Sequence, residues 1–174
     1  WEERRRVAAG NGSPHGPAEL SDGSLLFVGN WSDCPVAARA NEPITTLGAR
    51  LSRDDGRTWE LIGTIPERPG DVPGHYHEPH AVQLPDGRII VHIRNHNKQD
   101  GGHILQSESA DGGRTFSVPH DTGLVGLPNH LLVLRDGRIL TTYGYRILPY
   151  GNRAALSADG GCTWSGPMVL DEKP

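Results

Sequence analysis

The sequence has few cysteines, no long apolar segment and no excess of positive charge. Its two cysteines, Cys34 and Cys162, are too few for a disulfide scaffold and form no CxxC zinc motif, so we interpret both as thiols without a functional role. No stretch approaches the roughly 20 apolar residues that span a bilayer. No basic segment precedes an apolar one, so we expect no signal peptide in these residues. A formal net charge of −4 excludes the basic surface typical of proteins that bind nucleic acid or anionic membranes.

Glycine and proline are abundant, with 23 and 14 copies among 174 residues. Their combined share exceeds the roughly 12% of average proteins but stays below that of low-complexity disorder. Counted together with glycine, the apolar residues reach an ordinary globular share, so a core can form. The composition excludes collagen and coiled coils, and no segment has a convincing helical pattern.

Two short motifs alternate three times along the chain. The first is an apolar stretch interrupted by Asp-Gly, at Asp22-Gly23, Asp86-Gly87 and Asp136-Gly137. Asp-Gly between β-prone runs predicts a two-residue type I′ hairpin, because both central positions of that turn need positive φ.

The second motif is a box of the form Ser-x-Asp-x-Gly-x-Thr-aromatic, at residues 52–59, 109–116 and 157–164. Aspartate accepts backbone N–H groups in tight turns and glycine supplies positive φ, so we interpret the boxes as folding devices on the outside of the fold. The aromatic residue is expected to plug the turn against its sheet. We predict that a third strand ends at each box serine and that a fourth begins at the box aromatic.

Four-stranded units that recur about every 50 residues are typical of a β-propeller. We predict an all-β fold in which residues 1–174 form one partial propeller domain, with units at approximately 1–60, 61–117 and 118–174. Trp1 matches the last position of a further, truncated box. Three units cannot close a ring and would expose apolar flanks. We therefore expect either a piece of a longer protein or two copies that assemble as a homodimer.

One edge of the predicted inner hairpins gathers residues that can carry chemistry. Pairing around the Asp-Gly turns places Pro79 opposite Arg94, His130 opposite Tyr143, and His15 opposite Asn30. Titratable groups that converge at a channel mouth are costly unless they are used, which predicts a site at this edge. The residues gathered there are His15, His77, Glu78, His80, Arg94, His96, His130, Tyr143, Tyr145 and Arg146.

Glu78 and Arg94 are the sharpest pair within this group. Arginine favours the ionised form of a neighbouring carboxylate, which can then act as a base, and a guanidinium can hold a substrate carboxylate through two contacts. The alternatives are a structural ion pair here and, for each histidine, a polar strand cap. A metal site is chemically possible but matches no spacing template, and we predict neither a metal nor a cofactor. Its ligands would be His77, Glu78, His80 and His130.

The boxes, together with the segment EPHAVQLPDGRIIVHIR at 78–94, resemble the sialidase (neuraminidase) superfamily and its BNR-repeat proteins. The match covers nearly the whole chain and implies a six-bladed β-propeller. The family's enzymes hold the sialic acid carboxylate with three arginines and use a Tyr nucleophile paired with a Glu, while an Asp serves as acid/base. The resemblance implies that Glu78 is this Glu, that Arg94 is one of the arginines, and that Arg146, or its rival Arg153, is another.

The sequence also departs from the family pattern. The family's first arginine and its Asp lie upstream of this chain, its Tyr lies beyond Pro174, and the outer-strand segment Arg4–Arg6 is a poor substitute. The histidine cluster resembles instead related propeller enzymes that cleave uronate- or rhamnose-containing glycans with a His acid or base. His80 and His130 are thus further catalytic candidates. The remaining substrate-binding candidates are His15, His77 and Tyr145.

We therefore predict an exo-acting glycoside hydrolase that removes terminal sialic acid or related acidic sugars from a glycan. This chain alone is expected to lack the full catalytic set, and no nucleic acid or membrane partner is predicted. The alternatives are a His-based glycan hydrolase or lyase on the same fold and a non-catalytic carbohydrate-binding propeller. The resemblance favours a secreted or periplasmic location, but the residues themselves leave localisation open.

Overall fold

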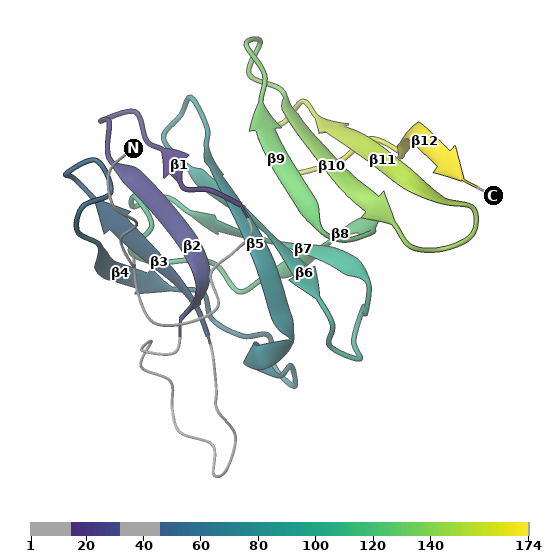
Figure 1. The fold of residues 1–174 in the computed structure, drawn as a ribbon, viewed down its shortest axis with the longest axis horizontal. Helices are drawn as coiled ribbons and strands as arrows, with labels where there is room; N and C mark the ends of the chain where they lie inside the picture. Colours follow the sequence, from purple (N-terminus) through teal and green to yellow (C-terminus); the bar gives the residue numbers. More distant parts are fainter. Residues whose placement is uncertain (1–14, 32–45, 174) are drawn as a thin grey trace.

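The computed structural model describes residues 15–31 and 46–173, which form three four-stranded antiparallel sheets (Figure 1). Within each sheet, strands adjacent in sequence are adjacent in space. The first sheet contains β1 (Ala18–Glu19), β2 (Leu25–Trp31), β3 (Thr46–Ser52) and β4 (Glu60–Thr64). The second contains β5 (Tyr76–Gln83), β6 (Ile89–Asn95), β7 (His103–Ser109) and β8 (His120–Val125). The third contains β9 (Asn129–Val133), β10 (Ile139–Tyr145), β11 (Tyr150–Ser157) and β12 (Met168–Lys173).

The first strands of the sheets lie next to one another. Strand β5 contacts β1 and β2 of the first sheet and β9 of the third, so it runs between its neighbours as Figure 1 shows. This is the arrangement of consecutive propeller blades, with β1, β5 and β9 as the inner strands. The described ranges contain no helix that is long and apolar enough to cross a membrane. Trp1, Cys34 and the segment Arg4–Arg6 lie outside the described residues.

The predicted two-residue hairpin turns are wrong by one residue. Leu84 donates its N–H to the Arg88 carbonyl at 2.8 Å, so the loop holds three residues. Only its glycine has positive φ (Gly87, 88°), while the Asp86 carboxylate accepts the Arg88 N–H at 3.0 Å. The aspartate thus supports a longer loop by its own hydrogen bond and need not adopt the left-handed conformation. The loops at Gly23 and Gly137 share this pattern.

The longer loops shift the register of every inner hairpin. Asn129, and not His130, lies opposite Tyr143. In the second sheet the loop shifts the pairing by one residue, to His80 opposite His92. The bulge between His77 and His80 shifts it by one more, so Arg94 lies opposite His77, and not opposite Pro79. His15 lies before β1, whose pairing with β2 begins at Ala18 opposite Leu26. Because successive side chains on a strand point to opposite faces, a one-residue change decides which residues meet at the site.

The boxes fold as predicted. In the third box Ser157 Oγ donates to Asp159 Oδ1 at 2.8 Å, and the same oxygen accepts the Thr163 N–H at 2.9 Å. These bonds lower the pKa of Asp159 to about 2, with the Thr163 hydroxyl as the largest cause. The third strands end at the box serines, as predicted, but the fourth strands begin one to four residues after the aromatic residues.

Each of the later boxes packs against the sheet before it, and not only against its own. A Cβ on Gly113 would lie 3.2 Å from Leu26 of the first sheet, and one on Gly161 would overlap Ile90 of the second. The Trp164 indole lies 4.8 Å from the His92 ring and donates to the Gln106 side chain at 3.2 Å. The boxes therefore join neighbouring blades.

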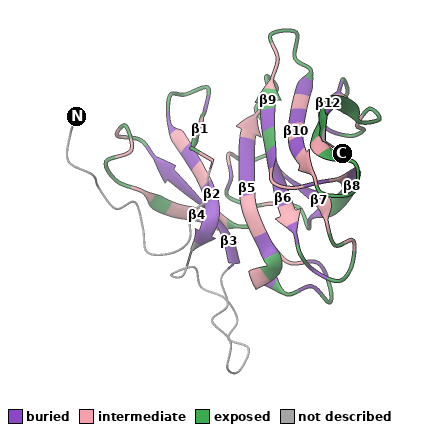
Figure 2. Cartoon of the chain, turned by 45° about the vertical axis from the view of Figure 1, so that its right-hand side comes forward, coloured by how far each residue is buried: buried purple, intermediate pink, exposed green. Residues whose placement is uncertain are grey.

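The core lies between the blades, and one apolar face stays open (Figure 2). Ile90 of the second sheet is buried against Leu131 and Ile139 of the third. The third sheet has no such cover among the described residues: Leu132 is 50% exposed and Leu170 is 58% exposed. This agrees with the expected exposed flank.

Candidate active site

The Glu78–Arg94 pair lies at the start of β5 and the end of β6. Arg94 Nη1 donates to Glu78 Oε2 at 2.6 Å, and the side chains are 24% and 30% exposed. The carboxylate is therefore paired but still open to a ligand on one side. An ion pair of this exposure contributes little to stability, which leaves room for a functional role.

Glu78 is held in a strained backbone conformation. Its φ is +42°, and it precedes Pro79, a combination that ordinary residues avoid. The pairing of β5 with β6 shifts between His77 and His80, so that Glu78 and Pro79 bulge out of the ladder. Bulges and strained residues are common beside active sites because they re-aim a side chain.

Two histidines flank this pair. Arg94 Nε donates to His96 Nε2 at 2.8 Å, and the rings of His77 and His96 lie 5.0 Å apart. Burial, followed by the positive charge of Arg94, lowers the pKa of His96. The pKa of His77 is also lowered, first by burial and then by His96. Both imidazoles are therefore neutral at pH 7, and the charged side chains of this group are Glu78 and Arg94.

Three more histidines converge from three successive blades. The rings of His80 and His130 stack at 4.1 Å, and the His15 ring lies 4.7 Å from His80. Leu131 donates its N–H to His80 Nδ1 at 2.9 Å. Burial is the largest cause that lowers the pKa of His80, to about 3, so the ring is neutral and its proton is on Nε2.

This geometry does not fit a metal well. Ligand atoms of His15, His80 and His130 lie within 4.8 Å of one another. However, His80 has no lone pair left for a metal while Nδ1 accepts the backbone N–H and Nε2 carries the proton. The ligand set considered from the sequence is not brought together, because His77 stacks on His96 and Glu78 binds Arg94.

A cavity of about 540 Å³ opens beside the histidines, at the same end of the third sheet. Arg146 lies on its wall, and its Nε donates to the Leu127 carbonyl at 3.2 Å. The rest of this exposed guanidinium is available to a ligand. The cavity is lined by His15, Pro128, Asn129, His130, Thr142, Tyr143, Gly144, Arg146, Asn152, Leu170 and Asp171.

Arg153, the rival of Arg146, is buried in the third sheet. It donates to Glu172 Oε1 at 2.7 Å and to the Asp171 carbonyl at 3.0 Å, and it lies 4.7 Å above the Tyr145 ring. These contacts join β11 to β12 and occupy the guanidinium. Of the two arginines, Arg146 is therefore the one that is free to meet a ligand.

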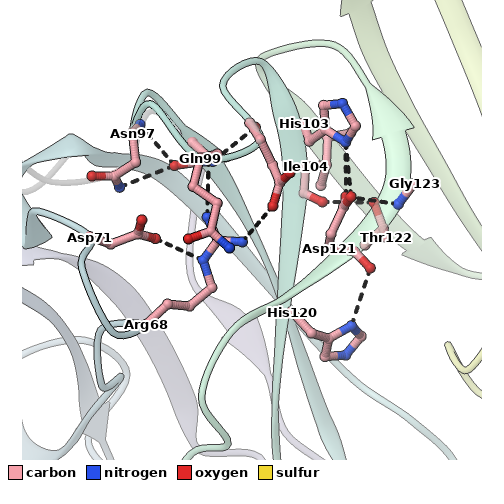
Figure 3. A network of polar contacts seen from close by, with 12 residues as sticks. Arg68, Asp71, Asn97, Gln99, His103, Ile104, His120, Asp121, Thr122 and Gly123 are labelled. Atoms are coloured by element: carbon pink, nitrogen blue, oxygen red, sulfur yellow. Dashed lines mark hydrogen bonds and ion pairs between the residues drawn. The ribbon is translucent and has the colours of Figure 1, made fainter.

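A buried polar network around the Arg68–Asp71 pair (Figure 3) fixes the start of β5. Arg68 Nε donates to Asp71 Oδ2 at 2.7 Å, and the Tyr76 hydroxyl donates to the same oxygen at 2.7 Å. Burial raises the pKa of Tyr76 to about 12, so the hydroxyl keeps its proton. Tyr76 is two residues before Glu78, and this network anchors the strand on which Glu78 stands.

Three other histidines lie outside the inner hairpins. His103 lies 3.0 Å from Asp121, and His120 lies 2.8 Å from Glu108, both along β7 and β8 (Figure 3 shows the former). His75 is exposed. His103 and His120 stand apart from the candidate site, whereas the His75 carbonyl accepts the His96 N–H at 2.9 Å.

Sequence reasoning missed Asn129 and Asp171 on the cavity wall and the buried His92. Asn129 directly precedes His130, at the edge that the sequence did single out. Asp171 comes from an outer strand, which a search along the inner hairpins does not reach.

The whole chain, residues 1–174, matches the family model of the BNR repeat-like domain. The chain belongs to this family. No curated protein sequence matches it significantly.

Solved structures resemble this BNR repeat-like chain over nearly its full length. A protein of unknown function from Dyadobacter fermentans is 27% identical, with a TM-score of 0.74 over 91% of this chain and 42% of its own. A Hadza microbial sialidase is 19% identical, with a TM-score of 0.64 over 91% and 38%. The α-L-arabinanase of Penicillium chrysogenum, complexed with arabinobiose, is 16% identical, with a TM-score of 0.67 over 96% and 54%.

These likenesses establish the fold: the chain forms about three blades of a β-propeller of the kind that glycoside hydrolases use. The chain spans about two fifths to a half of the length of these structures.

Proposed function

We propose that this BNR repeat-like chain supplies part of the active site of an exo-acting glycoside hydrolase that removes a terminal acidic sugar, sialic acid or a close relative. The observation that carries the proposal is the Glu78–Arg94 pair, held on a strained bulge at the mouth of an inner strand. A base and a carboxylate-binding group stand side by side there, both partly exposed.

Glu78 is proposed as the base that activates a tyrosine nucleophile. Arg94 Nη1 donates to its Oε2 at 2.6 Å, and the bulge turns it out of the sheet. The resemblance to sialidases assigns the tyrosine, the acid/base aspartate and a further arginine to segments outside these 174 residues. Activity is therefore proposed for the whole protein, whether the missing parts come from a longer chain or from a second copy.

Arg94 and Arg146 are proposed to bind the substrate carboxylate. Within residues 15–31 and 46–173, the Arg94 Nη2 makes no hydrogen bond and Arg146 lines the neighbouring cavity with only its Nε engaged. Arg153 is proposed to hold the cavity wall in place through its contacts with the Tyr145 ring and with β12. His15 and His77 are proposed to border the sugar.

The stacked histidines favour a second candidate, a His-based glycan hydrolase or lyase. His80 is neutral with a fixed tautomer, so it suits a hydrogen-bond donor better than a base. The reacting imidazole would then be His130, which is exposed and lines the cavity.

The test is release of a fluorescent aglycone from a sialoside by the protein as its host makes it. Glu78→Gln and Arg94→Lys should each lower kcat/KM by roughly 10²- to 10⁴-fold, because each removes a proton-transfer or charge contact in the transition state. Glu60→Gln, at an exposed carboxylate on the outer strand β4, is the matched control and should retain full activity. All variants should keep the wild-type Tm.

The alternatives give different results. Loss of turnover in His130→Ala, with Glu78→Gln still active, would favour the histidine enzyme. An acidic glycan that binds but stays intact on prolonged incubation would identify a non-catalytic carbohydrate-binding propeller.

A further inference from the structure

The third blade contains a buried amide with unmet hydrogen-bonding capacity. Asn129 is only 1% exposed, and within the described part of the chain neither its Oδ1 nor its Nδ2 has a partner. A buried polar group without a partner is costly, and most such groups in native proteins are satisfied. An exception needs an explanation, and a ligand that supplies the missing partners is one.

Asn129 also has the position of a binding residue. It begins β9, pairs with Tyr143 at the end of β10, and forms part of the wall of the cavity of about 540 Å³. This is the end of the sheet that corresponds to the Glu78–Arg94 end of the second blade. His130, its neighbour in sequence, stacks on His80, two residues after Glu78.

The backbone around this cavity is closely fitted. Leu127 donates its N–H to the Gly144 carbonyl at 2.8 Å, and a Cβ on Gly144 would lie 2.9 Å from the Leu127 carbonyl oxygen. A Cβ on Gly126 would overlap the Tyr143 ring. Two glycines thus let the segment before β9 lie directly on the end of β10, and the amide is held in place instead of turning toward solvent.

The cavity wall has the chemistry that sugars need. The Arg146 guanidinium can hold an acid, Asn152 and the Asp171 carboxylate can bind hydroxyls, and the Tyr143 ring offers an apolar face. The Asn129 amide adds one acceptor and a pair of donors side by side. That combination suits a ring substituent that both donates and accepts, such as a hydroxyl or an acylamino group.

We propose that Asn129 is a specificity-determining residue whose amide binds a hydroxyl or acylamino substituent of the acidic sugar whose carboxylate lies against Arg146. This proposal rests on the proposed function, since it uses the same sugar. A site built to hydrogen-bond a substrate group discriminates strongly against analogues that lack it, because its own polar atoms are then left without partners. Asn129 thus sets which acidic sugar is accepted.

The experiment is calorimetric titration of the protein as its host makes it with three probes. They are N-acetylneuraminic acid, 2-keto-3-deoxynonulosonic acid (a hydroxyl in place of the acetamido group) and neutral galactose. The test variant is Asn129→Leu, which is close to isosteric. It should weaken binding of the acids roughly 10- to 100-fold, as expected for the loss of two hydrogen bonds. Its Tm should stay level or rise, because the unpaired amide is gone.

Asn95→Leu is the matched control. Asn95 is equally buried, but its Nδ2 donates to the Gln99 and Asp100 carbonyls at 2.9 Å and its Oδ1 accepts the Asn97 N–H at 2.9 Å. The same substitution there should lower the Tm. The difference in Tm between the two variants distinguishes an amide that binds a ligand from one that stabilises the fold.

The outcomes separate this proposal from the proposed function. Unchanged affinity for both acids in Asn129→Leu would overturn the role of Asn129 and indicate an amide satisfied by water. A fall in Tm equal to that of Asn95→Leu would also overturn it. A greater loss of affinity for N-acetylneuraminic acid would identify the acetamido group as the bound substituent, and equal losses would identify a hydroxyl. Failure of the wild type to bind either acid would overturn the acidic-sugar function and this proposal with it.

Discussion

Glu78 combines a functional side chain with an unfavourable backbone. A left-handed φ at a residue of this type costs on the order of 1–3 kcal/mol, and it persists only where the surroundings impose it. Here the Tyr76 network fixes the strand on one side, and Pro79 removes an N–H that the ladder would otherwise use. The strain is located at the residue proposed to do chemistry, which is where such strain is usually retained.

Gly63 provides the sharpest steric test at the scale of one residue. A Cβ there would collide with the backbone carbonyl oxygens of Gly113 and Arg114, which cannot move without shifting the second box. Gly63→Ala should therefore lower the free energy of unfolding by about 2–4 kcal/mol, beyond the usual cost of overpacking. Urea denaturation measures it, with Gly166→Ala, which has open space around it, as the control. Equal stability of the two variants would contradict the packing described here.

The sequence predicted the type of each site residue better than its contacts. Glu78 and Arg94 were brought together correctly because their long side chains meet even though the pairing at Arg94 is shifted by two residues. Asn129 was missed because an asparagine at a strand start looks like any polar cap. What distinguishes it is that neither polar atom of its amide has a hydrogen-bond partner among the described residues. Similarly, nothing in the sequence separates Arg146 from Arg153, whose difference lies in contacts with β12.

At the scale of elements, the boxes and the inner hairpins differ in how predictable they are. A box is closed by its own residues, so its conformation follows from local sequence, as the Asp159 contacts show. A hairpin register depends on loop length, and Asp-Gly fits both the two- and the three-residue loop. The choice between them is made by hydrogen bonds such as that from Arg88 N–H to Asp86, which composition alone does not reveal.

The box aromatics are not equivalent, and this leads to a prediction. Trp164 lies between the second and third sheets and bonds Gln106, whereas Trp59 bonds the Gly56 carbonyl and meets Phe27 within its own sheet. Trp164→Ala should therefore destabilise the fold more than Trp59→Ala, by about 3–5 kcal/mol for the former. Thermal unfolding of both variants gives the order. The reverse order would show that these plugs act within a sheet.

At the scale of the whole molecule, buried histidines make stability depend on pH. Burial is the largest cause that lowers the pKa of His80 to about 3 and that of His92 to about 4. In the unfolded chain both titrate near 6.5. Below pH 6.5 these two histidines become protonated in the unfolded state but stay neutral in the native state. The free energy of unfolding therefore falls with acidification, by up to about 1.4 kcal/mol per pH unit for each histidine.

Urea denaturation between pH 7.5 and 4.5 measures this dependence. The window lies above the range in which the box aspartates lose their contribution, since those groups titrate below about pH 4 when unfolded. His92→Gln should reduce the slope by the share of one histidine. A flat profile above pH 4.5 would show that the buried rings do not control acid stability.

The contacts between boxes and sheets have a direction. The second box closes on the first sheet and the third box closes on the second, so each blade is covered by the one that follows it in the chain. A polypeptide that emerges from the ribosome in this order always meets a face that has already formed. The blades can thus fold one after another during synthesis, and at each stage only the face of the last blade to form is left uncovered.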